Sequence, residues 1–96
     1  MNNRKETLKV LLAVKEELPA ARFVCVAADY AMEDKKITQG ACEQFKGMIA
    51  GRLRYEYTVD SWLRKYHGID TVNYTPDVKL DYRQRWVDAM IKEFSS

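Results

Sequence analysis

The sequence predicts an all-α protein, a compact bundle of about five helices in a single domain spanning residues 1–96. Apolar residues recur at helical spacing along nearly the whole chain, and most apolar stretches end at a proline, a glycine or a capping residue. With 47% hydrophobic and 31% charged residues, the composition is that of one globular domain. No internal repeat or long linker divides the chain.

The first two helices are predicted over residues 4–18 and 20–33. Pro19 restricts Leu18 to an extended conformation, which ends the first helix. The second helix is the most apolar segment and is expected at the centre of the bundle. Its short run over residues 23–26, Phe-Val-Cys-Val, is β-branched and follows a proline, so a strand is the alternative there. The apolar face of the first helix consists of Leu8, Leu11, Leu12 and Val14.

Thr38 is the predicted N-cap of a third helix over residues 39–54. This helix carries three glycines that share one side, each costing up to ~1 kcal/mol relative to alanine. Close approach of a neighbouring helix within the chain explains them; a smooth stripe for a dimer partner or ligand is the alternative. The glycines are Gly40, Gly47 and Gly51. The residues expected to face inward are Ala41, Phe45, Met48, Ile49 and Leu53.

A short fourth helix is predicted over residues 59–67, capped by Thr58 and ended by Gly68. The last helix is predicted over residues 77–94. It has two apolar stripes, so it either wedges between two helices or shares one side with a second subunit; we therefore expect a homo-oligomer. The stripes are Val78, Tyr82, Trp86, Ala89 and Met90, and Leu80, Val87, Ile91 and Phe94. The predicted core is Leu8, Leu11, Leu12, Phe23, Val26, Ala27, Phe45, Ile49, Trp62, Leu63, Trp86 and Ile91.

Composition also excludes several classes of function. The net charge of +2 is too small for a dedicated nucleic-acid binder. One histidine and two distant cysteines leave little for a metal site, and no catalytic or cofactor motif is present, so we expect neither an enzyme nor a bound cofactor. The sequence shows no signal peptide and no membrane-spanning stretch, so the expected compartment is the cytoplasm, with reduced thiols.

The candidate site lies within residues 46–67, where five basic residues meet two acidic ones and aromatic residues are interleaved. Arginine offers a planar fork for phosphate and tyrosine a flat face for a base. Three interpretations stay open: a protein interface, a site for a nucleotide or a short nucleic-acid strand, or core aromatics with solvated charges around them. The candidate binding residues are Arg52, Arg54, Tyr55, Tyr57, Arg64, Lys65, Tyr66 and His67. A second, smaller basic and aromatic group consists of Tyr82, Arg83, Arg85 and Trp86.

Three runs of sequence carry a resemblance to a known group of proteins. They are residues 42–53 (CEQFKGMIAGRL), 57–69 (YTVDSWLRKYHGI) and 83–91 (RQRWVDAMI). In these runs the chain resembles small uncharacterised accessory proteins of tailed bacteriophages, over roughly residues 42–96. The resemblance implies an accessory role in the host cytoplasm, where such proteins often inhibit a host protein or counter host defence.

The leading functional expectation is therefore a non-enzymatic protein that binds and inhibits a host or host-defence protein. The alternative is an oligomeric sponge that sequesters a phosphorylated or cyclic nucleotide signal. A small DNA-binding regulator is a further alternative, which the low net charge and the apolar surface of the predicted helix over residues 59–67 disfavour.

Overall fold

The computed structural model describes the backbone of residues 4–53 and 76–95 and the side chains of residues 4–49 and 78–95. Within these ranges every regular element is a helix, which confirms the all-α class. The predicted helix over residues 59–67 lies outside the described residues. The four described helices are α1 (Arg4–Ala21), α2 (Val24–Glu33), α3 (Gln39–Leu53) and α5 (Pro76–Ser95).

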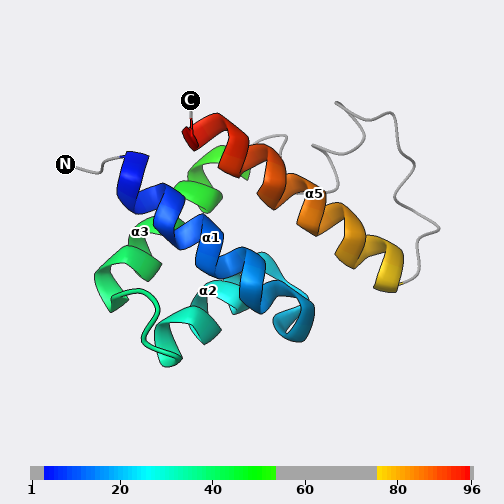
Figure 1. Ribbon diagram of the computed structural model, residues 1–96, viewed down its shortest axis with the longest axis horizontal. Helices are drawn as coiled ribbons and strands as arrows, with labels where there is room; N and C mark the ends of the chain where they lie inside the picture. The colour runs from blue at the N-terminus through cyan, green and yellow to red at the C-terminus, as the bar shows by residue number, and fades with distance from the viewer. Residues whose placement is uncertain (1–3, 54–75, 96) are drawn as a thin grey trace.

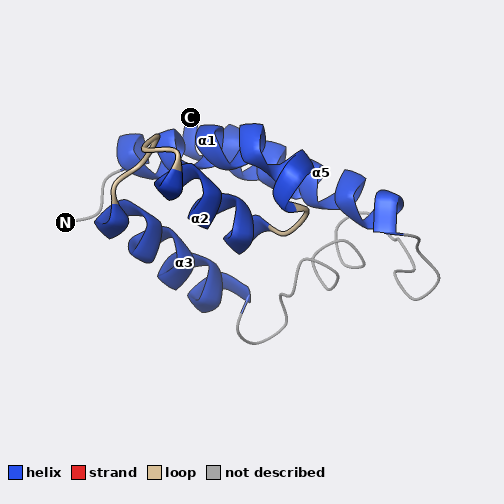
Figure 2. Ribbon diagram, turned by 90° about the horizontal axis from the view of Figure 1, so that it is seen from below, coloured by secondary structure: helices blue, strands red, loops and turns tan. Residues whose placement is uncertain are grey.

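Helix α1 is the centre of the arrangement, because it contacts each of the other three described helices. It lies beside α5, with the two chain ends at the same side of the molecule (Figure 1). The Arg4 guanidinium stacks 5.0 Å from the centre of the Phe94 ring and donates to the backbone oxygen of Glu93, so α1 and α5 are antiparallel. Seen from below, α2 and α3 lie on one side of this helix pair (Figure 2).

The apolar pattern of α1 explains its central position. Its buried residues recur at three- and four-residue steps and so form one stripe along the helix. Leu11, Val14 and Leu18 are fully enclosed, and burying each of them stabilises the fold by about 1.5–3 kcal/mol. The prediction that Leu12 is buried is wrong: its side chain is 48% exposed, because the residue after Leu11 points away from the stripe. The buried set is Thr7, Val10, Leu11, Ala13, Val14, Leu18 and Ala21.

The predicted end of the first helix at Leu18 is also wrong, since α1 continues through Pro19 to Ala21. A proline in the last turn removes one backbone hydrogen bond, whereas continuing the helix buries both Leu18 and Ala21 against the core. The helix ends at Ala21, and the next residue, Arg22, has a left-handed φ of 70°. The Arg22 amide donates to the Leu18 carbonyl at 2.6 Å, which satisfies an otherwise open carbonyl in the last turn.

Helix α2 begins at Val24, four residues later than predicted. Residues 24–26 are helical, so the strand alternative is wrong. Phe23 precedes the helix in an extended conformation, with φ −117° and ψ 144°. Phe23 was expected in the core, but this backbone conformation places it before the helix rather than on the inner face, and its side chain is 55% exposed.

The connection between α2 and α3 closes one helix and caps the next. Lys35 adopts a left-handed φ of 61°, and the amides of Lys35 and Lys36 donate to the carbonyls of Met32 and Ala31, at 3.0 and 2.9 Å. This is the Schellman pattern, formed here without glycine. Thr38 Oγ1 then accepts a hydrogen bond from the Ala41 amide at 3.1 Å, which confirms the predicted N-cap of α3.

Helix α3 faces the core with Phe45 and Ile49, as predicted. The explanation offered for its glycines is wrong at two positions. A Cβ built at Gly40 or Gly47 would have no atom of a neighbouring element within 4 Å, so none of the four described helices approaches closely there. The side chain of Leu53 and the surroundings of Gly51 are not among the described parts of the structure.

Most of both predicted stripes of α5 packs within the chain, but Val78, the first residue of the first stripe, is 38% exposed. Trp86, Val87 and Met90 are buried, and Trp86 is the largest fully buried side chain described. The second stripe is partly buried against the same core through Leu80, Ile91 and Phe94. A second subunit is therefore not required to cover Trp86, Val87 or Met90, and the homo-oligomer stays a prediction. Of the other predicted core residues, Leu8 and Val26 are half-buried, and Trp62 and Leu63 lie outside the described residues.

Candidate functional site

The site predicted within residues 46–67 lies almost entirely outside the described residues. Arg52 belongs to the last turn of α3, but its side chain is not described. The arrangement of these side chains therefore stays a prediction. The same holds for Arg54, Tyr55, Tyr57, Arg64, Lys65, Tyr66 and His67.

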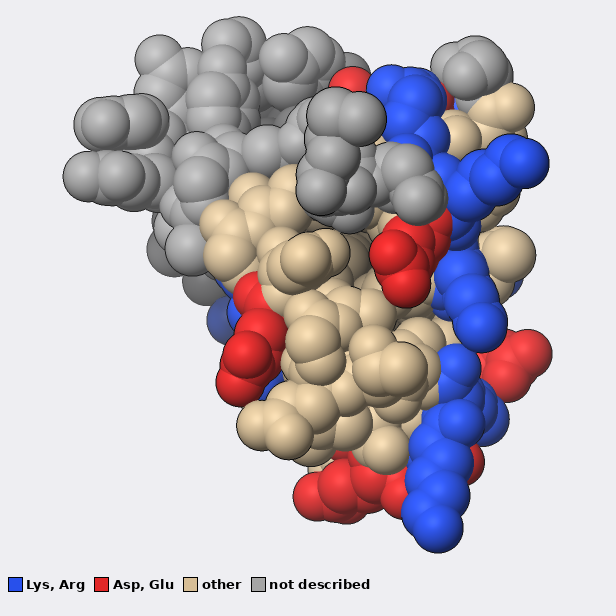
Figure 3. Space-filling model, turned by 90° about the vertical axis from the view of Figure 1, so that its left-hand side faces the viewer, with Lys and Arg blue, Asp and Glu red and all other residues tan. Residues whose placement is uncertain are grey.

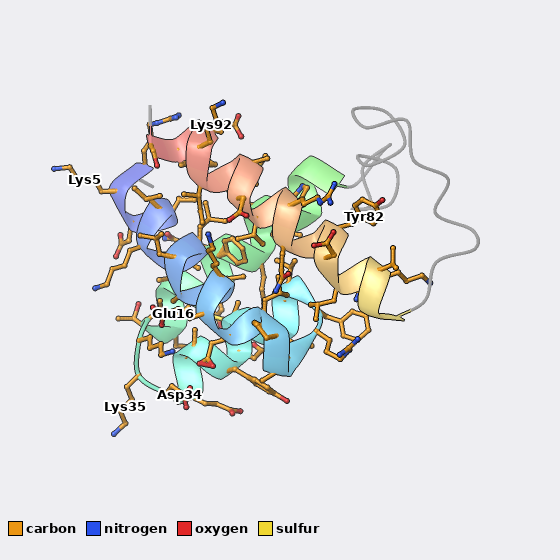
Figure 4. All side chains as sticks on the ribbon, turned by 45° about the vertical axis from the view of Figure 1, so that its right-hand side comes forward. Lys5, Glu16, Asp34, Lys35, Tyr82 and Lys92 are labelled. Atoms are coloured by element: carbon orange, nitrogen blue, oxygen red, sulfur yellow. The ribbon has the colours of Figure 1, made fainter. Side chains whose placement is uncertain are left out.

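The second basic and aromatic group, on α5, is described, and the structure divides it. Trp86 is 1% exposed and belongs to the core. Tyr82 and Arg83 are half-buried, and Arg85 is exposed. Tyr82 lies on the outer side of α5 in Figure 4. Three of the four residues therefore reach the surface of one helix.

Arg83 connects this surface to the turn between α1 and α2. Its guanidinium lies 4.5 Å from the centre of the Phe23 ring, a cation–π contact. Nη1 of Arg83 also donates to the Arg22 carbonyl at 3.0 Å. The left-handed turn at Arg22 and the extended Phe23 are thus held by one side chain from a helix more than 50 residues away in the sequence.

A second arginine is fixed along the outer side of α5. Arg85 Nε lies 3.1 Å from Asp81 Oδ2, an i,i+4 ion pair. Its guanidinium also lies 5.1 Å from the centre of the Tyr82 ring. Both charged partners are more than half exposed, so the ion pair orients Arg85 rather than stabilising the fold appreciably.

Phe23 and Arg83 make up one surface, here called the Phe23–Arg83 face. Val78, Tyr82 and Arg85 lie on another side of α5, because residues two positions apart on a helix, such as Arg83 and Arg85, do not face the same way. Val78 is 38% exposed, and on a helix it shares a side with Tyr82 and Arg85, four and seven residues later. The charged residues from 78 to 86 are Lys79, Arg83, Arg85 and Asp81, so this stretch of α5 carries 3 − 1 = +2. The Phe23–Arg83 face therefore combines an exposed aromatic ring with the positive charge of Arg83. Phe23 was missed as a site residue because its hydrophobicity predicted burial.

The seam between α2 and α3 holds the two cysteines of the chain. Cys42 Sγ lies 3.7 Å from Asp29 Oδ1, and Asp29 forms an ion pair with Lys46. Burial raises the pKa of the Cys42 thiol and of the half-buried Cys25 thiol, and Lys46 lowers both only in part. Both thiols are therefore less ionised than a free cysteine at neutral pH, which disfavours nucleophilic catalysis here.

A small hollow lies between α1 and α3, with a volume of about 10 Å³, which is room for about one water molecule. Pockets that enclose drug-sized ligands have volumes of about 300–1,000 Å³, so this hollow is too small for a nucleotide. Its lining residues are Glu6, Thr7, Val10, Ala41, Gln44 and Phe45. Within the described ranges, no three side chains of the metal-binding types come together as a ligand set.

The surface charge is mixed on the face that Figure 3 shows. Basic side chains gather along one edge, acidic side chains lie beside them, and uncharged residues occupy the middle. None of the helices in residues 4–53 and 76–95 combines the length and apolar character needed to cross a membrane.

Comparison of the chain with protein-family models, with curated proteins and with solved structures found no match. The resemblance to small phage proteins thus rests only on the three runs of residues that carry it.

Proposed function

We propose that the chain is a non-enzymatic protein that binds another protein through the Phe23–Arg83 face. The observation that carries the proposal is the Phe23 ring, which is 55% exposed and is fixed by Arg83 rather than buried. Aromatic and arginine side chains supply a large share of the energy in protein interfaces, provided that they are already ordered before binding.

The charge of this face indicates the chemistry of the partner. The Phe23 ring is apolar and the Arg83 guanidinium beside it is positive, so an acidic surface with an apolar centre is complementary to this face. The inhibition of a host or host-defence protein is part of the proposal and rests on the resemblance to phage proteins. The nucleotide sponge and the DNA-binding regulator depend on residues 52–67, whose side chains are not described, and they stay predictions.

A capture experiment with matched variants tests the proposal. The wild-type chain, Phe23→Ser and Leu12→Ser are immobilised and exposed to the same bacterial lysate. Leu12 is the control, because it is also a large exposed apolar residue but belongs to the middle of α1. We expect one protein to be retained by wild type and Leu12→Ser, and at least about tenfold less by Phe23→Ser, a difference of ~1.4 kcal/mol. Equal retention by all three chains would contradict the proposal.

A further inference from the structure

Four charged side chains meet where α1 approaches the connection between α2 and α3. Glu16 and Glu17 come from α1, and Asp34 and Lys36 come from the connection. Lys36 Nζ lies 3.0 Å from Glu16 Oε2 and 3.4 Å from Glu17 Oε2. Figure 4 shows Glu16 and Asp34 in the same lower corner of the molecule. The lysine therefore bridges two carboxylates of α1 and holds the connection against that helix.

The two glutamates of this corner have different surroundings. The Glu16 side chain is 68% exposed, whereas that of Glu17 is only 13% exposed. Oε2 of Glu17 is buried and accepts no hydrogen bond from the described residues, although Lys36 lies within ion-pair distance. A buried carboxylate oxygen without a hydrogen bond is unfavourable, and the neighbouring carboxylate of Asp34 adds repulsion. The ionised form of Glu17 is thus poorly accommodated.

We propose that this corner is a proton-sensitive clasp, in which a proton on Glu17 joins α1 to the α2–α3 connection. The proton comes from solvent and binds the Glu17 carboxyl group, which then donates a hydrogen bond to the Asp34 carboxylate. Lys36 keeps its ion pair with Glu16 and gives up the longer one with Glu17. The repulsion between Glu17 and Asp34 is replaced by a carboxyl–carboxylate hydrogen bond, which joins α1 to the connection beside the ion pair of Lys36 with Glu16.

The electrostatics of the corner agree with this proposal in sign. The hydrogen bond that protonated Glu17 gives to Asp34, followed by burial and by the charge of Asp34, raises the pKa of Glu17 above its ordinary value, and Lys36 lowers it only in part. The folded chain therefore binds this proton more tightly than the unfolded chain. Stability gains from Glu17 as the pH falls through its raised pKa toward the ordinary one. Glu16 raises the pKa of Lys36, which stays charged throughout this window.

Two glutamine variants of neighbouring residues test the clasp, because the proposal gives their effects opposite signs. Glu17→Gln imitates the protonated side chain, and Glu16→Gln removes the exposed ion pair with Lys36. At about pH 7.5 we expect Glu17→Gln to melt above wild type and Glu16→Gln below it. At about pH 4.5 the advantage of Glu17→Gln should shrink by at least about half. Glu17→Gln melting below wild type at both pH values would overturn the proposal.

A titration of the full-length wild-type chain gives a second readout that does not depend on a variant that folds. The carboxyl carbon of Glu17 is followed by nuclear magnetic resonance as the pH is lowered. We expect its midpoint above the ordinary glutamate value in wild type, and closer to that value in Asp34→Asn. A wild-type midpoint at or below the ordinary value, or one that Asp34→Asn leaves unchanged, would overturn the proposal.

Discussion

Replacing Arg83 with alanine removes two contacts that hold α5 to the turn between α1 and α2. The first is the hydrogen bond from the guanidinium to the Arg22 carbonyl, at 3.0 Å in a partly buried position. Hydrogen bonds from charged groups contribute about 1.5–3 kcal/mol, and partial exposure favours the lower end. The second is the cation–π contact with Phe23, worth about 0.5–1 kcal/mol at an exposed site. Arg83→Ala should therefore lower the free energy of unfolding by about 2 kcal/mol.

Thermal and urea unfolding of the purified chain measure this loss. For a domain of this size, about 2 kcal/mol corresponds to a melting temperature roughly 8–16 °C lower. Phe23→Ala should cost only the cation–π contact, so the double variant with Arg83→Ala should reveal a coupling of about 0.5–1 kcal/mol. If Arg83→Ala unfolds within about 0.5 kcal/mol of wild type, or the two changes are additive, the reasoning about this contact is refuted.

Three further predictions concern local structure and the thiols. Thr38→Ala should lower the free energy of unfolding by about 1 kcal/mol in urea titrations, because the Ala41 amide loses its cap. Gly47→Ala should raise it by up to about 1 kcal/mol, since the new methyl group meets open space, and a variant no more stable than wild type would contradict that. Cys25 and Cys42 should be alkylated far more slowly in the native chain than in urea at neutral pH, with rates that rise as the pH increases, because burial raises both thiol pKa values. Equal rates in both states would show that the thiols are not protected.

The fold class was predictable because helical periodicity is dense in this chain. The buried stripe of α1, the N-cap at Thr38 and the burial of Trp86 each follow from local pattern. The ends of helices were less predictable where no glycine follows the last turn. Arg22 and Lys35 both adopt left-handed conformations that normally favour glycine, so nothing in their identities predicts the ends of α1 and α2.

The described surface was predictable only in part. The group on α5 is visible in the sequence, because Tyr82, Arg83 and Arg85 follow one another closely. Its partner Phe23 is not, since a phenylalanine in an apolar stretch predicts burial and the contact joins residues 60 positions apart. Hydrophobicity alone likewise failed for Leu12, which lies one residue away from the buried stripe of α1. Whether such side chains are buried depends on long-range contacts and on the direction that a turn gives the chain.

The central claim is that the Phe23–Arg83 face is where the chain meets its partner, and site-specific photo-crosslinking tests it most directly. A photoreactive phenylalanine analogue is placed at position 23 in one chain and at position 12 in another, and both are irradiated in cells that contain the partner. We predict a discrete cross-linked product from position 23 that is absent from position 12. Cross-linking from position 12 alone, or from neither position, would contradict the claim.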